Sequence, residues 1–77
     1  MTIKTHEISN LLETLGLSVG NISLDDNFLV IEIDSFIEDE FFVFASLEDI
    51  LRDTINMSYE NNSITVEYNP ETVINLI

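Results

Sequence analysis

The carboxylates of this sequence are numerous enough, and close enough together, to act jointly in a chemical or binding role. Five of them lie within residues 31–44, together with four phenylalanines and no lysine or arginine. These five are Glu32, Asp34, Glu38, Asp39 and Glu40. Closely spaced carboxylates can act as an acid–base pair, bind a metal ion, or present negative charge to a basic partner. Each of these roles requires a different sequence pattern around the carboxylates.

The sequence lacks the usual patterns of a catalytic carboxylate pair and of a metal-binding loop. A calcium-binding EF-hand loop needs acids at alternating positions around a central glycine, and the only glycines, Gly16 and Gly20, lie outside the acidic runs. A pair of glycosidase carboxylates works in a cleft that holds a sugar, which so short a chain can hardly build. The single histidine, His6, has no neighbour that would orient it as a base. We therefore expect no enzyme activity, no cofactor and no metal site.

Length and composition predict one domain over residues 1–77. Hydrophobic residues make up 45% of the chain, which is too high for a disordered acidic tail. The absence of cysteine leaves neither a disulfide framework nor a thiolate metal site. The N-terminal residues do not resemble a signal peptide, and no apolar stretch approaches the roughly 18 residues of a membrane span. We expect a cytoplasmic protein.

Net charge narrows the choice of partner. Fifteen acidic residues face only Lys4 and Arg52, which gives a formal charge of −13. Such a charge repels nucleic acid and anionic membranes, so direct binding to either is not expected. A basic protein would instead be attracted and steered into contact, at a rate that falls as salt rises.

The elements that must position these carboxylates begin with a helix. Apolar residues recur at spacings of three and four between Thr5, the expected cap, and Gly16, the expected stop. Three strands are predicted next, over residues 17–24, 28–33 and 40–45. A bulge at Gly20-Asn21 would explain a slip in the first strand's apolar phase, and Asp25-Asp26-Asn27 reads as the turn that follows.

The second half is predicted to hold a helix, a hairpin and a final helix. Ser46-Leu47-Glu48-Asp49 is a capping signature, which favours a helix over residues 46–55. A two-residue turn at Asn61-Asn62 would place Tyr59 opposite Ile64 and Met57 opposite Val66, with every apolar pair on one face. Asn69-Pro70-Glu71 is typical of a helix start, although residues 72–77 also have a β-like composition.

The resulting order is α-β-β-β-α-β-β-α. It predicts an α+β fold in which helices pack on one face of an antiparallel sheet of about five strands. On such a sheet, side chains recur at about 6.6 Å along a strand and about 4.8 Å between strands. These spacings are of the same order as the regular row of DNA phosphates, one per about 3.4 Å of axis on each strand. We therefore expect these acids to form an anionic array, with Phe36 and Ile37 as apolar anchors. The candidate partner-binding residues are Asp25, Asp26, Glu32, Asp34, Phe36, Ile37, Glu38, Asp39 and Glu40.

In length, lack of cysteine, acidity and compact α+β pattern, the whole chain resembles the small phage and mobile-element proteins that disarm host defence, namely anti-CRISPR proteins and anti-restriction DNA mimics. The resemblance implies a non-enzymatic inhibitor that occludes a basic nucleic-acid-binding site on a defence protein in the host cytoplasm. An immunity or antitoxin-like module that neutralises a basic toxin is the alternative. A structural homodimer whose acidity serves solubility is a further one.

Overall fold

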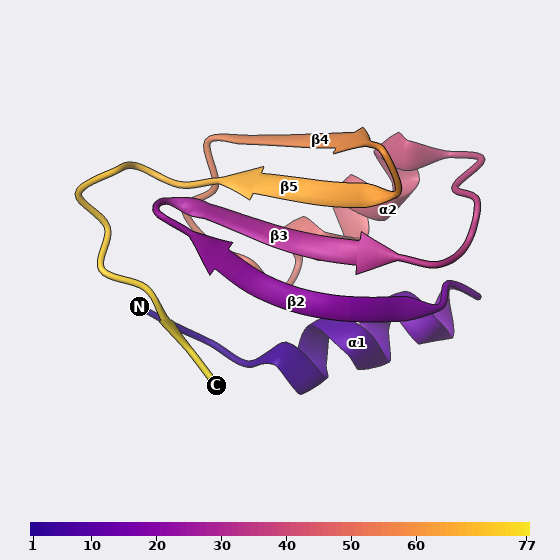
Figure 1. Ribbon diagram of the computed structural model, residues 1–77, viewed down its shortest axis with the longest axis horizontal. Helices are drawn as coiled ribbons and strands as arrows, with labels where there is room; N and C mark the ends of the chain where they lie inside the picture. The colour runs from indigo at the N-terminus through magenta and orange to yellow at the C-terminus, as the bar shows by residue number, and fades with distance from the viewer.

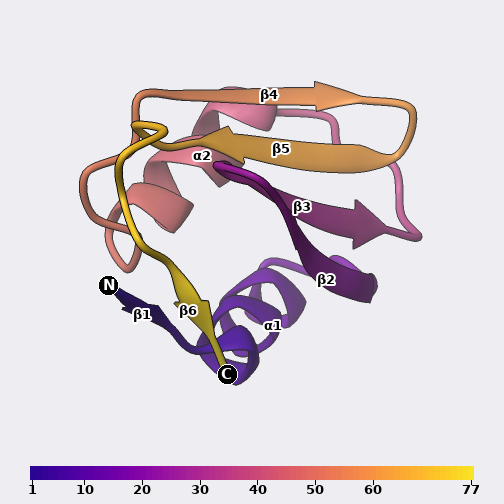
Figure 2. The same ribbon diagram turned by 60° about the vertical axis from the view of Figure 1, so that its left-hand side comes forward.

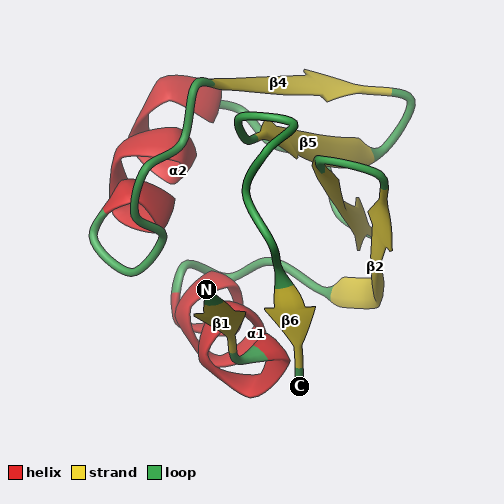
Figure 3. Ribbon diagram, turned by 90° about the vertical axis from the view of Figure 1, so that its left-hand side faces the viewer, coloured by secondary structure: helices red, strands yellow, loops and turns green.

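Four antiparallel strands form the main sheet, in the order β2-β3-β5-β4. Their bounds are Val19–Asp25 for β2, Phe28–Ile33 for β3, Asn56–Glu60 for β4 and Ser63–Glu67 for β5. The computed structural model describes all residues, from Met1 to Ile77. Both helices lie on the same side of the sheet (Figures 1 and 3). The predicted α+β fold is confirmed, with four strands in the main sheet and a separate pair of short parallel strands.

The first helix, α1, spans Thr5–Thr14 and buries Ile8 and Leu12 against the sheet. It ends where predicted, because Gly16 adopts a left-handed conformation with φ of 86°. The predicted cap is wrong by one residue. Lys4 occupies the capping position without a side-chain hydrogen bond, and the backbone N–H of Thr5 instead donates to the carbonyl of Ile77 at 2.7 Å.

Both hairpins form, the first with the predicted bulge and the second with the predicted pairing. The register between β2 and β3 shifts between Val19 and Ile22, which places the bulge at Gly20-Asn21. In the second hairpin Tyr59 lies opposite Ile64 and Met57 opposite Val66. Its turn residues Asn61 and Asn62 have φ of 52° and 60°, as a type I′ turn requires.

The second helix, α2, spans Glu40–Glu48, and this corrects two predictions. Residues 40–45 are helical and not a strand, and the chain beyond Glu48 does not continue as the predicted helix over 46–55. Asp39 is the cap, because its Oδ1 accepts a hydrogen bond from the backbone N–H of Phe42 at 3.1 Å. The Ser46 hydroxyl donates to the carbonyl of Phe42 at 2.9 Å and caps nothing.

The C-terminal segment is a turn and a short strand, so the predicted terminal helix does not form. The Asn69 side chain accepts from the N–H of Glu71 at 2.9 Å, which closes the turn around Pro70. Strand β6 (Asn75–Leu76) then pairs in parallel with β1 (Thr2–Ile3), which brings the two ends of the chain side by side (Figure 2).

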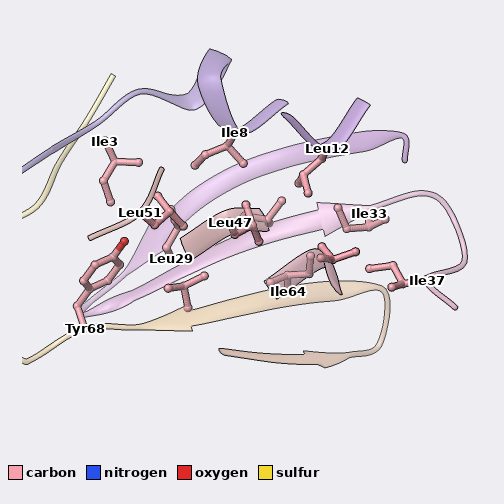
Figure 4. Close-up of a cluster of buried hydrophobic side chains, with 13 residues drawn as sticks. Ile3, Ile8, Leu12, Leu29, Ile33, Ile37, Leu47, Leu51, Ile64 and Tyr68 are labelled. Carbon is pink, nitrogen blue, oxygen red and sulfur yellow. The ribbon is translucent and has the colours of Figure 1, made fainter. Parts of the chain in front are cut away.

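The core lies between the two helices and the inner face of the sheet (Figure 4). All its buried side chains are hydrophobic, and no charged residue is buried. They are Ile3, Ile8, Leu12, Leu29, Ile31, Ile33, Ile37, Val43, Leu47, Leu51, Ile64, Val66 and Tyr68. Neither helix has the length and apolar content needed to cross a membrane.

Candidate functional site

Six of the seven predicted partner-binding acids fall into two groups, and the seventh, Glu32, lies on β3. Asp25 and Asp26 lie at the turn between β2 and β3, whereas Asp34 and residues 38–40 lie beyond the far end of β3 (Figure 1). The six residues of β3 separate the groups by about 20 Å, at about 3.3 Å per residue. A continuous array of all the predicted acids is therefore not formed.

The outer face of the sheet also spaces its acids widely. Glu32 is exposed on this face, opposite Ser63, and Ser63 in turn lies opposite Glu60. Glu32 and Glu60 are thus two strands apart, or about 9.6 Å, which is twice the spacing between adjacent strands. Acids are closer together where they are neighbours along the chain, as at Asp25-Asp26 and at residues 38–40.

The segment between β3 and α2 is held at both ends, and this fixes the position of Phe36. The N–H of Asp34 donates to the carbonyl of Ser18 at 2.7 Å, and the N–H of Ser18 donates to the Ser35 hydroxyl at 2.8 Å. Ile37 is inserted into the core (Figure 4). Between these anchors the Phe36 side chain is 80% exposed.

Ile37 is therefore not the exposed apolar anchor that the sequence suggested, since only 6% of its surface is accessible. Two other phenylalanines take that place. Phe41 and Phe42, in the first turn of α2, are 75% and 57% exposed. We call Phe36, Phe41 and Phe42 the phenylalanine patch.

The sequence pattern does not predict the exposure of Phe41 and Phe42, because it places them in a core strand. The signal that could have revealed them is Asp39, whose side chain is a suitable helix cap three residues before Phe42. A helix starting there buries positions four apart, and Val43 and Leu47 are indeed its buried residues. The flanking phenylalanines must then face outward.

Two hollows flank α2, one on each side of its exposed face. The first has a volume of about 410 Å³ and lies between the end of α1 and the start of α2. Phe36, Phe42 and Leu17 contribute to its apolar lining, and Glu38 and Asp39 contribute its charge. The second, about 300 Å³, lies between α2 and the chain leading into β4. There the ring of Phe41 meets that of Phe44 edge to face, with centroids 6.3 Å apart.

Helix α2 consequently leaves apolar surface uncovered. A helix that is apolar on every side is normally buried on every side, yet this one buries only Val43 and Leu47. Ala45 is exposed beside the two outward phenylalanines. The helix therefore presents an apolar ridge to its surroundings.

Negative charge surrounds this ridge. Glu38, Asp39 and Glu40 precede and begin α2, and Glu48 ends it. Neither hollow is lined by a lysine or arginine. Lys4 and Arg52 both line a smaller hollow of about 160 Å³ near the N-terminus. Arg52 also lines a further hollow together with Glu48, so lysine and arginine are absent from the two hollows at the phenylalanine patch but not from the far end of α2.

No group of potential metal ligands accompanies the patch. His6 is exposed on α1, and no three His, Asp or Glu side chains gather as metal ligands would. What the arrangement offers is an apolar centre with a carboxylate rim, the layout of a protein-binding surface. A comparison of the chain with protein-family models, with curated proteins and with solved structures found no match.

Proposed function

We propose that this protein is a non-enzymatic inhibitor that binds a basic, nucleic-acid-handling protein and covers its nucleic-acid-binding site. The observation that supports this most is the phenylalanine patch exposed among Glu38, Asp39 and Glu40, with no lysine or arginine in either adjoining hollow. In the proposal the protein acts in the cytoplasm of a host cell, in the manner of the small acidic anti-defence proteins that it resembles.

Aromatic burial provides the affinity in this proposal. A large aromatic side chain buries about 150–250 Å². Since the three rings are 80%, 75% and 57% exposed, their exposed parts together would contribute roughly 400 Å² to an interface. That is about half of the roughly 800 Å² that each partner buries in an interface of standard size. Aromatic residues in the centre of an interface are also the ones that most often dominate its binding energy.

Charge selects the class of partner. A second copy of the chain would bring another −13 to the same surface, so the carboxylate rim would face like charges. A basic surface would instead meet the rim with lysine and arginine. Surfaces that bind nucleic acid are basic for the same electrostatic reason, because they must neutralise phosphates.

The test is capture of the partner with variants that separate the two ends of the molecule. Glu38→Lys with Glu40→Gln changes charge beside the patch and leaves the Asp39 cap intact. Asp25→Lys with Asp26→Asn changes the net charge equally at the opposite end of β3, and asparagine tolerates the φ of 53° at position 26. Phe36→Ser with Phe41→Ser removes the two most exposed of the three rings.

The phenylalanine pair and the Glu38/Glu40 pair should each weaken capture of one basic protein by at least about tenfold. The Asp25/Asp26 pair should leave it nearly unchanged. Circular dichroism verifies that every variant is folded. Equal capture by all variants, or loss through the Asp25/Asp26 pair alone, would refute the proposed surface.

A further inference from the structure

Strand β4 forms an open edge of the main sheet. It is the last strand in the order β2-β3-β5-β4, and no chain lies beyond it in Figures 1 and 2. Soluble proteins usually protect such an edge with lysine, proline or a bulge. The opposite edge, β2, has its bulge between Val19 and Ile22, whereas β4, Asn-Met-Ser-Tyr-Glu, contains neither lysine nor proline.

The hydrogen-bond ladder shows which groups of β4 point outward. The N–H of Ile33 donates to the carbonyl of Asn62 at 2.8 Å, and that of Tyr68 donates to Asn27 at 2.9 Å. Even-numbered residues of β5 therefore bond to β3, and its odd-numbered residues bond to β4. By this alternation the backbone N–H and C=O groups of Ser58, which lies opposite Thr65, point toward β5. Met57 and Tyr59 then direct their N–H and C=O groups to the open edge.

An apolar hollow adjoins this edge. The hollow of about 300 Å³ between α2 and β4 is lined by Met57, Ile55, Phe41 and Phe44, among others. Met57 thus offers free backbone groups on one side and lines the hollow with its side chain. An extended segment paired with β4 would bring alternate side chains to this same face.

The carboxylates near the hollow indicate which residue types such a segment would contain. The one charged residue that lines the hollow is Glu48, and Glu60 ends β4. Pairing of β4 with a second copy would be opposed by the net charge of both molecules. A segment with lysine or arginine next to apolar residues would complement both the carboxylates and the hollow.

We propose that β4 accepts an extended basic segment of the partner as a fifth strand, with an apolar side chain of that segment placed in the hollow between α2 and β4. This inference rests on the proposed function for the basic character of the partner. Backbone hydrogen bonds to Met57 and Tyr59 would provide affinity, and the hollow would provide selectivity.

A synthetic peptide of alternating lysine and valine is the probe, and amide hydrogen exchange is the readout. Strand addition should slow exchange at Met57 and Tyr59 by at least about tenfold, whereas Ser58, already bonded to β5, should change little. The same peptide with alternate backbone nitrogens methylated should bind at least about tenfold more weakly. Binding without protection of Met57 and Tyr59, or no binding, would overturn the inference.

Two variants separate this inference from the proposed function. Met57→Pro removes one edge donor without removing a bond to β5, and Ala45→Phe fills the hollow from an exposed position of α2. Each should weaken peptide binding at least about tenfold, and Ser58→Ala should not. If both variants capture the partner as well as wild type while the Glu38/Glu40 pair fails to, strand addition is wrong and the proposed function stands. If the double variant Glu38→Lys with Glu40→Gln also captures the partner as well as wild type does, the proposed function is wrong too.

Discussion

Two adjacent residues, Phe36 and Ile37, have opposite environments, and this predicts opposite effects of substitution. Ile37 is almost fully buried, so Ile37→Ala should lower the free energy of unfolding by about 2–5 kcal/mol. Phe36→Ser should change it by less than about 0.5 kcal/mol, because its ring lies in solvent. Urea denaturation of both variants checks this, and similar losses in the two would contradict the assigned burial.

Tyr68 is the other single residue with a specific consequence. Its side chain is fully buried, and its hydroxyl has no hydrogen-bond partner. Tyr68→Phe should therefore stabilise the protein by about 1 kcal/mol, since it removes an unpaired polar group and keeps the ring. Thermal or urea unfolding measures this effect. A loss of stability would show that the hydroxyl has a partner.

The same hydroxyl gives a pH dependence. Burial, with a smaller contribution from the charge of Asp53, raises the pKa of Tyr68 above its ordinary value of 10.0. The folded state thus favours the neutral hydroxyl, so this stabilisation is complete below pH 10.0 and is lost as pH rises through the folded-state pKa. Between about pH 8 and about pH 11, wild type should lose more stability than Tyr68→Phe. Equal losses would contradict the raised pKa.

At the scale of elements, α2 depends on its cap. Asp39→Ala removes the acceptor for the N–H of Phe42 and should lower the free energy of unfolding by about 1 kcal/mol. Glu38→Ala is the matched control, because it removes an exposed carboxylate one residue away that makes no capping bond. Urea denaturation compares the two. A larger loss in Glu38→Ala would be inconsistent with Asp39 as the cap.

How far the sequence predicts each element depends on how local its signals are. The β4–β5 hairpin was predicted residue by residue, because Asn61-Asn62 and the alternation around it leave one register that buries every apolar side chain. Helix α2 was not, because residues 41–44 are all apolar and show neither a strand nor a helix period. Parallel pairing of β6 with β1 joins the ends of the chain, which no local pattern reveals. The exposed position of the acids beside Phe36 therefore follows from the sequence, whereas the exposure of Phe41 and Phe42 and the two hollows do not.

At the scale of the whole molecule, charge opposes folding. The net charge of −13 is held within extents of 32 × 21 × 20 Å. Raising NaCl from about 0.01 M to about 0.1 M shortens the screening length from about 30 Å to about 10 Å. The free energy of unfolding should then rise, by on the order of 1 kcal/mol. Urea denaturation at the two salt concentrations measures it, and a decrease would contradict net repulsion in the folded state.

Charge is also unevenly distributed over the molecule. The acids around the phenylalanine patch lie where β3 leads into α2, and Lys4 and Arg52 line a hollow near the N-terminus. Under the proposed function, a basic partner would therefore be steered toward α2 and its adjoining hollows. The rate of association should fall as salt rises, more steeply than the rate of dissociation changes.

The central claim is that this protein and nucleic acid compete for one surface of the partner. It is tested most directly by measuring the apparent Kd of the purified partner for this protein at increasing concentrations of duplex DNA. Mutual exclusion predicts that the apparent Kd rises in proportion to DNA concentration once DNA exceeds its own Kd. An unchanged Kd, with all three components in one complex, would contradict occlusion and favour the antidote of a basic toxin.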